Sequence, residues 1–300
     1  MFREFFSIMN YISTHPITKT NRLMALKNVI RWQVGSRLLG KRVIVPWVDQ
    51  SKFLVGLGET GLTGNLYAGF MEYYDMLFLL HALRSDEVFV DVGANIGAYT
   101  ILASKVVGSR SVSFEPLPET VEKLREQVQL NDIGDLVCVR NTGVSDKKGS
   151  LFFTNNADTV NKVSLSGEGQ NTTSVEVVTL DDELNDNSRY FFKIDVEGFE
   201  YNVLQGGSRV LSSPNTRAII IELNGSGKDF GHDDNEIHNK ITSFGFEPVN
   251  YDPASRRLTK LPNFNQNGGN TIYIKDIEEM RVRCKESPKR MVHTADGVLI

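Results

Sequence analysis

The stretch VFVDVGANIGAYT at residues 88–100 holds an apolar run, an aspartate, a glycine-rich turn and the start of a helical apolar pattern. This order predicts a strand, a tight loop and a helix N-terminus. Glycine tolerates positive φ and carries no Cβ, so a ligand can approach the backbone of such a loop closely. The turn is G-x-N-x-G, so it lacks both the G-x-G-x-x-G dinucleotide motif and the Lys-Ser/Thr of a P-loop.

An acidic residue at the entrance of this short turn favours a cationic ligand over a pyrophosphate. S-adenosylmethionine is such a ligand, because it carries a sulfonium and an ammonium but no phosphate. Glu115 supports this interpretation, since it ends the next apolar run at 111–115 and Pro116 stops that strand. An acidic residue at this place can accept hydrogen bonds from both ribose hydroxyls. The structural alternatives are an ordinary βα turn and a solvated strand end.

The composition is that of a soluble globular protein, with 40% hydrophobic and 23% charged residues in 300. The net charge is −4 and no basic stripe is visible, which argues against a nucleic-acid partner. Cys138 and Cys284 are too few and too far apart for a disulfide scaffold or a zinc site. We expect Cys138 in the core, a reducing, cytoplasmic location and no membrane span.

The chain divides into three segments by its patterning. Residues 1–85 are expected to form an N-terminal extension packed on the main domain. In it, Leu23, Leu26, Ile30 and Val34 have helix spacing, and residues 56–64 are turn-like. Residues 277–300 are expected to form a solvated or disordered tail.

Residues 86–276 alternate strand and helix, which predicts a parallel sheet with helices on both faces. The predicted strands are 87–91, 111–115, 136–140, 190–194, 218–223 and 271–275. The predicted helices are 97–107, 118–131, 199–206 and 233–243. An inserted β hairpin with a long loop breaks this rhythm within 142–180.

A second motif, FFKIDVEGFE at 191–200, again places an aspartate after an apolar strand. The run AIIIELN at 218–224 ends in the same way. Four predicted strands thus finish in Asp91, Glu115, Asp195 and Glu222, at the edge where open α/β sheets bind ligands. Converging carboxylates repel one another unless a cation, a proton or a ligand intervenes. The alternative is that Asp195 caps the following helix.

These residues resemble the FkbM-type S-adenosylmethionine-dependent methyltransferases. The resemblance rests on FVDVGANIG at 89–97, FEP at 114–116, TLD at 179–181 and KIDVEGFE at 193–200. It covers roughly residues 65–275. It implies a class I methyltransferase (Rossmann-like) α/β fold, whose seven-stranded, mostly parallel sheet has an antiparallel last strand. It also implies methyl transfer to a hydroxyl of a sugar, glycan or other small natural-product acceptor.

Carried onto this chain, the resemblance assigns a role to each motif residue. Asp91, Gly93, Asn95 and Gly97 fall in the cofactor loop and Glu115 on the ribose. Asn141 and Thr142 fall where the adenine would lie. Asp195 and Glu197 fall beside the transferred methyl group.

A sugar hydroxyl is a poor nucleophile unless a general base removes its proton. Asp195 is the first candidate for that base and Glu222 the second, while His232 and His238 are weaker candidates. Asp195, Glu197 and Glu222 together would be an oxygen-rich set that suits Mg²⁺, but no decisive ligand spacing supports a metal. Two other functions stay open: a non-catalytic partner-binding protein of the same fold, and a nicotinamide-dependent oxidoreductase. The sequence leaves the oligomeric state and the acceptor undetermined.

Overall fold

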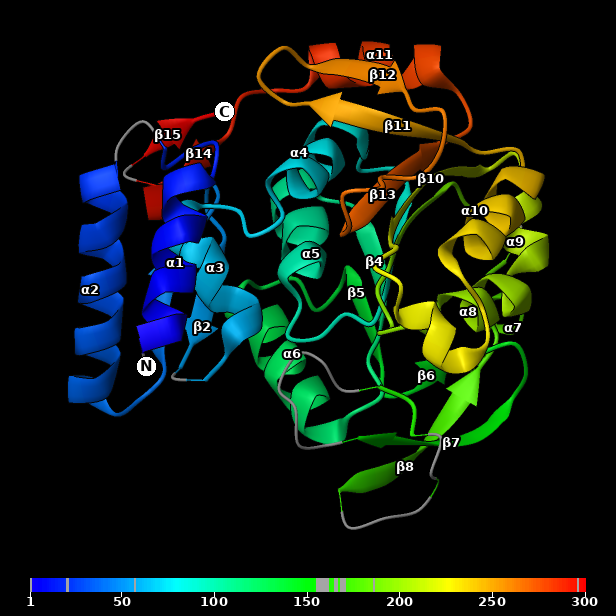
Figure 1. Ribbon diagram of the computed structural model, residues 1–300, viewed down its shortest axis with the longest axis horizontal. Helices are drawn as coiled ribbons and strands as arrows, with labels where there is room; N and C mark the ends of the chain where they lie inside the picture. Colours follow the sequence, from blue (N-terminus) through cyan, green and yellow to red (C-terminus); the bar gives the residue numbers. More distant parts are fainter. Residues whose placement is uncertain are drawn as a thin grey trace.

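The computed structural model describes residues 2–19, 22–56, 58–154, 162–164, 167, 171–185, 187–295 and 297–300. A central mixed sheet carries helices on both faces (Figure 1). Its strands are β3 (Val88–Val92), β4 (Arg110–Phe114), β5 (Val137–Arg140), β9 (Tyr190–Ile194), β10 (Thr216–Glu222), β11 (Glu247–Asp252), β12 (Arg257–Lys260) and β13 (Asn270–Ile274). They lie in the order β12-β11-β13-β10-β9-β3-β4-β5.

The five strands from β5 to β10 are parallel, and β13 pairs antiparallel with both β10 and β11. This arrangement confirms the expected α/β sheet with its antiparallel last strand. The sheet has eight strands instead of seven, because β12 forms a hairpin with β11. From β3 the chain runs outward to β4 and β5, and from β9 it runs the other way to β10. The switch point of the topology therefore lies between β3 and β9, where such sheets bind ligands.

All six predicted strands and all four predicted helices of the main domain are present. The predicted helices are α5 (Ala98–Ile101) with a π-helical continuation (Leu102–Val107), α6 (Pro118–Leu130), α8 (Glu200–Gly206) and α10 (Asp234–Ser243). Two short helices, α7 (Leu180–Glu183) and α9 (Ser208–Ser212), were not predicted. Asp233 and Glu236 form a capping box at the start of α10. Every residue of β3 and β9 is buried, as expected for central strands covered on both faces.

The predicted hairpin is also present. It consists of β7 (Gly149–Thr154) and β8 (Thr172–Val178), with β6 (Gly143–Val144) parallel to β8. Most of the polar loop between β7 and β8 lies outside the described residues. Cys138 is exposed rather than in the core, because β5 is the edge strand and its residues alternate between the two faces.

The N-terminal segment comprises α1 (Phe2–Thr14), α2 (Arg22–Leu39), β1 (Val43–Pro46), β2 (Lys52–Val55), α3 (Thr60–Ala68) and α4 (Tyr73–Ala82). Its buried side chains and those of α4 form one hydrophobic cluster with Phe89 and Phe191 of the sheet. The prediction of a turn-like segment at 56–64 is wrong for its second half, because α3 begins at Thr60. No helix in the described part of the chain is long and apolar enough to cross a membrane.

The C-terminal segment is ordered, so the expectation of a solvated or disordered tail is wrong. It forms α11 (Ile277–Glu286), β14 (Met291–Val292) and β15 (Val298–Leu299). Arg283 is 9% exposed and forms a salt bridge of 2.8 Å with the buried Glu87. Arg290 pairs with Asp49 at 3.0 Å. These contacts help to explain the order, because Arg283 and Arg290 have acidic partners elsewhere in the fold.

Candidate active site

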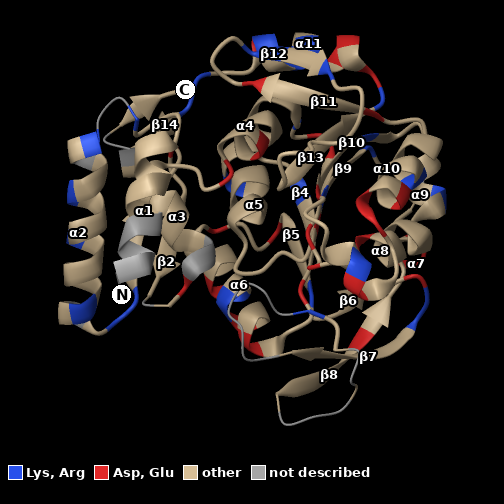
Figure 2. Cartoon of the chain, viewed as in Figure 1, with Lys and Arg blue, Asp and Glu red and all other residues tan. Residues whose placement is uncertain are grey.

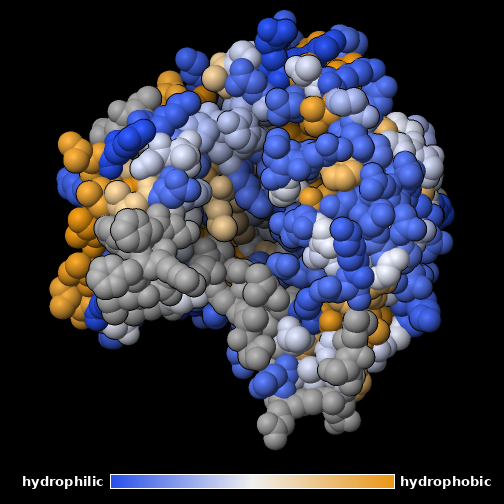
Figure 3. All heavy atoms as spheres, viewed as in Figure 1, coloured by the Kyte–Doolittle hydropathy of each residue, from blue (hydrophilic) through white to orange (hydrophobic). Residues whose placement is uncertain are grey.

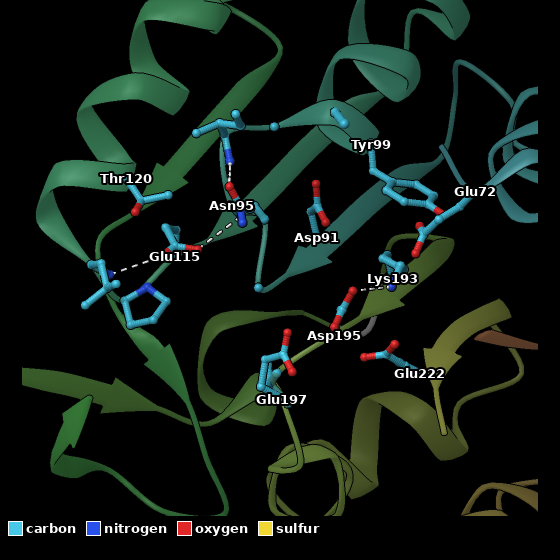
Figure 4. Close-up of a pocket in the computed structure, with 18 of the residues that line it drawn as sticks. Glu72, Asp91, Asn95, Tyr99, Glu115, Thr120, Lys193, Asp195, Glu197 and Glu222 are labelled. Atoms are coloured by element: carbon cyan, nitrogen blue, oxygen red, sulfur yellow. Dashed lines mark hydrogen bonds and ion pairs between the residues drawn. The ribbon is translucent and has the colours of Figure 1, made fainter. Parts of the chain in front are cut away.

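A pocket opens at the carboxyl ends of β3 and β9, at the switch point of the sheet. Its walls come from the turn after β3, the end of β4, the turn after β9, the end of β10 and the segment before α4. Side chains from all five regions point into one space (Figure 4). Of the predicted site residues, it is lined by Asp91, Gly93, Asn95, Gly97, Glu115, Asp195, Glu197 and Glu222.

The glycines of the first turn are required by packing as well as by φ. Gly93 has φ +81°, and a Cβ there would lie 1.9 Å from the backbone oxygen of Asp195. Gly97 has φ +90°, and a Cβ there would lie 2.4 Å from Leu124 Cδ1. We expected these glycines to leave room for a ligand. The structure instead gives Gly93 a neighbour within the protein, so a larger residue there would disturb the contact between the two turns.

Glu115 braces this first turn from the end of β4. Its carboxylate accepts hydrogen bonds from the backbone N–H of Asn95 and of Leu117, each at 3.0 Å. The side chain is almost fully buried, and burial raises the pKa of Glu115 to about 7. Each carboxylate oxygen has a second lone pair, so Glu115 can still accept a hydrogen bond from a ligand in the pocket.

Asp91 lies beneath the first turn and is 2% exposed. It accepts a hydrogen bond of 2.6 Å from the hydroxyl of Thr100, which lies 2.7 Å from the hydroxyl of Ser113. Burial raises the pKa of Asp91 to about 6. The carboxylate thus ties β3 to α5 while it lines the pocket.

Three carboxylates meet on the other side of the pocket. One oxygen from each of Asp195, Glu197 and Glu222 lies within 4.8 Å of the others, and all three side chains are half-buried. Burial and the charge of Asp195 raise the pKa of Glu222 to about 8. The same two causes raise the pKa of Glu197. This oxygen-rich set is the one that the sequence analysis considered for Mg²⁺.

Asp195 is not the cap of the following helix. The N-cap position of α8 is Phe199, which makes no side-chain cap hydrogen bond. The carboxylate of Glu200 instead accepts from the backbone N–H of Val196 and of Gly198, both at 3.2 Å. The structural alternative for Asp195 is therefore wrong. Its side chain points into the pocket (Figure 4).

Lys193 supplies a charge that the sequence analysis did not weigh. Its Nζ donates to Asp195 at 2.9 Å and to Asn270 Oδ1 at 3.1 Å, and it lies 5.5 Å from the centre of the Tyr99 ring. Lys193 is 2% exposed. Burial alone would lower the pKa of Lys193, but the charges of Asp195 and Glu72 outweigh it and raise that pKa above its usual value. The ammonium is therefore charged.

Asn270 extends this contact into a chain of hydrogen bonds. Its amide N–H donates to Asp75 at 3.2 Å while its amide oxygen accepts from Lys193. Asp75 belongs to α4, so the N-terminal segment contributes to the environment of Asp195. Lysine inside the apolar run YFFKI was the available signal, because an ionic group in a buried strand needs partners. The sequence patterns assigned no role in the site to Asn270 or Asp75.

Asn141 and Thr142 do not line the main pocket. The Asn141 amide donates to the backbone oxygens of Glu115 and Pro116, at 3.2 and 2.8 Å. Thr142 lines a smaller hollow that shares Gly93 and Pro116 with the main pocket, and its buried hydroxyl has no hydrogen-bond partner. A buried hydroxyl without a partner is a place where a ligand polar atom would be accommodated.

The two histidines lie outside the pocket. The His232 ring stacks on Tyr201 with centroids 3.7 Å apart, and His238 lies within 2.8 Å of the Tyr273 hydroxyl. Neither lines the pocket. The carboxylates are therefore the titratable groups best placed for proton transfer.

Comparisons with known proteins place the chain in a family. Residues 91–248, just over half of the chain, match the Methyltransferase FkbM domain. The chain is 31% identical over 153 residues to the hexuronic acid methyltransferase AglP of Haloferax volcanii, across 48% of this chain and 59% of that protein. It is 26% identical over 110 residues to the ribosomal protein L11 methyltransferase of Syntrophomonas wolfei, across 37% of this chain and 36% of that protein. The chain thus matches about half the length of these curated relatives.

Among solved structures, an O-methyltransferase from Bacillus cereus in complex with SAH aligns with a TM-score of 0.37 and 15% identity, covering 67% of this chain and 79% of that one. The matched family segment runs from Asp91 to Pro248 and so contains the first turn, Glu115, the second turn and Glu222. The chain belongs to the FkbM family of S-adenosylmethionine-dependent methyltransferases.

Proposed function

We propose that this protein transfers a methyl group from S-adenosylmethionine to a hydroxyl of a sugar, a glycan or another small natural-product acceptor. The observation that carries the proposal is the cluster of Asp195, Glu197 and Glu222 directly across the pocket from the first turn. A methyltransferase acting on a hydroxyl needs a donor site and a proton acceptor within reach of each other, and the pocket supplies both kinds of group (Figure 4).

The residues around the first turn fit the donor. Glu115 retains acceptor capacity for the ribose hydroxyls, and Asp91 is an acidic group beneath the turn. The unpartnered hydroxyl of Thr142 in the adjoining hollow offers a polar contact for the adenine. When bound, the donor supplies an electrophilic methyl carbon on a sulfonium. The first turn, Glu115 and Asp91 would hold the donor in the same pocket that Asp195, Glu197 and Glu222 line.

The carboxylates of Asp195 and Glu222 act as the base. S-adenosylmethionine bound there would supply an electrophilic methyl carbon and a neutral thioether as leaving group, and the acceptor oxygen would take the methyl group. The hydroxyl proton passes to the carboxylate pair. Alignment of the three reacting atoms can provide roughly 7–11 kcal/mol and a positioned base a further factor of about 10²–10⁴. Lys193 donates to Asp195, whereas the pKa of Glu222 is raised to about 8. The proton taken from the hydroxyl therefore comes to rest on Glu222.

Lys193 also makes a metal ion unnecessary in this scheme. Its ammonium already lies 2.9 Å from Asp195, where it offsets part of the charge of the cluster. The carboxylates offer the oxygen ligands that Mg²⁺ prefers.

The charge of the pocket favours a neutral acceptor. Six acidic residues line it, and Lys193 is the single cation among the described lining residues; the acidic residues are Glu72, Asp91, Glu115, Asp195, Glu197 and Glu222. An anionic acceptor would be repelled by this surplus unless its charge met Lys193. The similarity to a hexuronic acid methyltransferase supports a sugar acceptor, and the charge count supports a sugar hydroxyl rather than a sugar acid.

Calorimetry and a turnover assay test the proposal. We expect S-adenosylhomocysteine to bind with a 1:1 stoichiometry and NAD not to bind, which separates a methyltransferase from a nicotinamide-dependent oxidoreductase. In a panel of glycosides with a labelled donor, we expect methylation of a neutral hexoside to exceed that of the matching uronide. Cofactor binding without turnover on any acceptor, in wild type and Asp195→Asn alike, would support the non-catalytic alternative.

A further inference from the structure

The outer face of α2 is apolar, although it faces solvent. Leu23 is 81% exposed, Ile30 53%, Val34 51% and Leu38 81%. At 100° per residue these four positions lie within about 80° of one another around the helix. We call them the α2 stripe. Three of its members, Leu23, Ile30 and Val34, have the helix spacing described above, but they face away from the core. Ala25 and Val29 are buried on the opposite side of the helix.

Basic residues of α2 flank the α2 stripe, and this helix contributes no acidic residue. Arg22, Lys27, Arg31 and Arg37 of α2 are exposed, and the helix contains no Asp or Glu. Figure 2 shows this helix with blue segments and no red. Residues 5–48 contain seven Lys or Arg and no Asp or Glu, in a chain whose net charge is −4. The local positive charge is therefore opposite in sign to that of the whole protein.

We propose that the α2 stripe docks the protein on the surface of an anionic lipid bilayer. An exposed apolar helix face flanked by Lys and Arg is the pattern of helices that lie in the membrane interface. The apolar side chains enter the headgroup boundary, and each nearby basic residue is attracted by the negative surface potential. The helix lies on the membrane and does not cross it, which agrees with the lack of a spanning helix in the described residues.

Charge decides between a bilayer and a second copy of the chain. In a two-fold dimer the same patch meets itself, so the basic rims of two stripes would face each other with no acidic residue of α2 to pair them. Like charges in an interface oppose association. An anionic bilayer complements both parts of the surface at once. Figure 3 shows the apolar patch over α2 at the edge of the molecule. This proposal does not rest on the proposed function.

Co-sedimentation of the full chain with vesicles tests the proposal. The two probes are phosphatidylcholine vesicles and vesicles of phosphatidylcholine with phosphatidylglycerol. We expect partitioning onto the anionic vesicles to exceed that onto the neutral ones at least about tenfold, and to weaken as salt rises. Equal partitioning onto both, or none onto either, overturns the proposal.

Two variants separate the apolar and the basic parts of the surface. Leu23→Gln, Ile30→Gln, Val34→Gln and Leu38→Gln together keep good helix formers on exposed positions. Lys27→Glu with Arg31→Glu reverses two charges. We expect each variant to keep the circular dichroism of wild type and to lose at least about tenfold of its vesicle partitioning.

The matched control lies on α11, where Val282 is 53% exposed and Lys285 is also exposed. Val282→Gln with Lys285→Glu should leave partitioning unchanged. Equal losses in the control and the stripe variants would contradict a role for α2. Sedimentation velocity tests whether a second copy of the chain occupies the α2 stripe instead. A wild-type dimer that becomes a monomer with the four Gln substitutions, together with no vesicle binding, would assign the stripe to a second copy and overturn the proposal.

Discussion

The turn after β3 and the turn after β9 are built alike. They follow neighbouring parallel strands, in which Val92 pairs with Ile194. Each contains a residue other than glycine at positive φ, Asn95 at +49° and Glu197 at +53°. Each is braced by one buried carboxylate. Glu115 accepts from the N–H of Asn95 in the first turn and of Leu117 after β4. Glu200 accepts from two N–H groups of the second turn.

The two turns differ in what they present to the pocket. The first turn presents mainly its backbone and the amide of Asn95, while its brace Glu115 also lines the pocket. The second turn presents the carboxylates of Asp195 and Glu197, while its brace Glu200 is buried and does not line the pocket. One scaffold thus serves a surface suited to hold a ligand and a surface suited to proton transfer. The comparison makes different predictions for the two sides.

The largest expected effect is on turnover, at the second turn. Asp195→Asn should lower kcat by about 10²-fold or more, because a neutral amide neither accepts the proton nor balances Lys193. The affinity for S-adenosylhomocysteine should stay within about twofold of wild type, since we propose that the donor binds at the other turn. Steady-state kinetics and calorimetry check both statements. Near-normal turnover of this variant would show that Asp195 does not take part in the chemical step.

A pH profile should show the state of the carboxylate pair. The pKa of Glu222 is raised to about 8, so the proton that blocks the base is lost as pH rises through that value. We expect kcat/KM to rise about tenfold per pH unit below pH about 8 and then to level off. Glu222→Gln should abolish this rise while it lowers the plateau. A flat wild-type profile between pH 6 and 9 would contradict the assignment.

The two braces form a matched pair for the donor site. Glu115→Gln should weaken binding of S-adenosylhomocysteine at least about tenfold, because charge-assisted hydrogen bonds to the ribose are lost. Glu200→Gln alters an equivalent brace that does not line the pocket. The dissociation constant of S-adenosylhomocysteine from this variant should therefore change by less than about threefold. Both should lower the melting temperature, since each leaves buried N–H groups less well satisfied. Equal loss of affinity in the two variants would mean that Glu115 only holds the first turn in place and does not bind the ribose.

The smallest expected effect concerns positioning. Asn270→Ala removes the bridge between Asp75 and Lys193, and we expect kcat to fall about fivefold with little change in cofactor affinity. Asn270→Asp keeps an acceptor for Lys193 and should recover part of that loss. Asn267, an exposed residue of the loop just before β13, provides the control with Asn267→Ala. A lower melting temperature with unchanged kcat would mean that the bridge only stabilises the fold.

The sequence predicted what depends on local patterns. Buried apolar strands, their acidic ends and the glycine turns follow from residue order, so β3, β9 and the pocket carboxylates were found. The contacts of Gly93, Glu200 and Asn270 could not be predicted, because each depends on a backbone or side chain brought close only by the folded chain. The α2 stripe has correct helix spacing, but periodicity alone does not say whether an apolar face meets the core or the solvent.

The contacts between Asp49, Arg290 and Val292 bear on how the protein is made. Val48 forms a β-bridge with Val292, and 241 residues separate Asp49 from Arg290. At about 5–20 residues per second, roughly 12–50 s of synthesis pass between the two. During that interval the first elements emerge from the ribosome without their final neighbours, and the backbone oxygen of Trp47 lacks the N–H of His293. We therefore expect nascent chains that end before residue 290 to engage chaperones, and ribosome-stalled chains of increasing length to gain protease resistance only near full length.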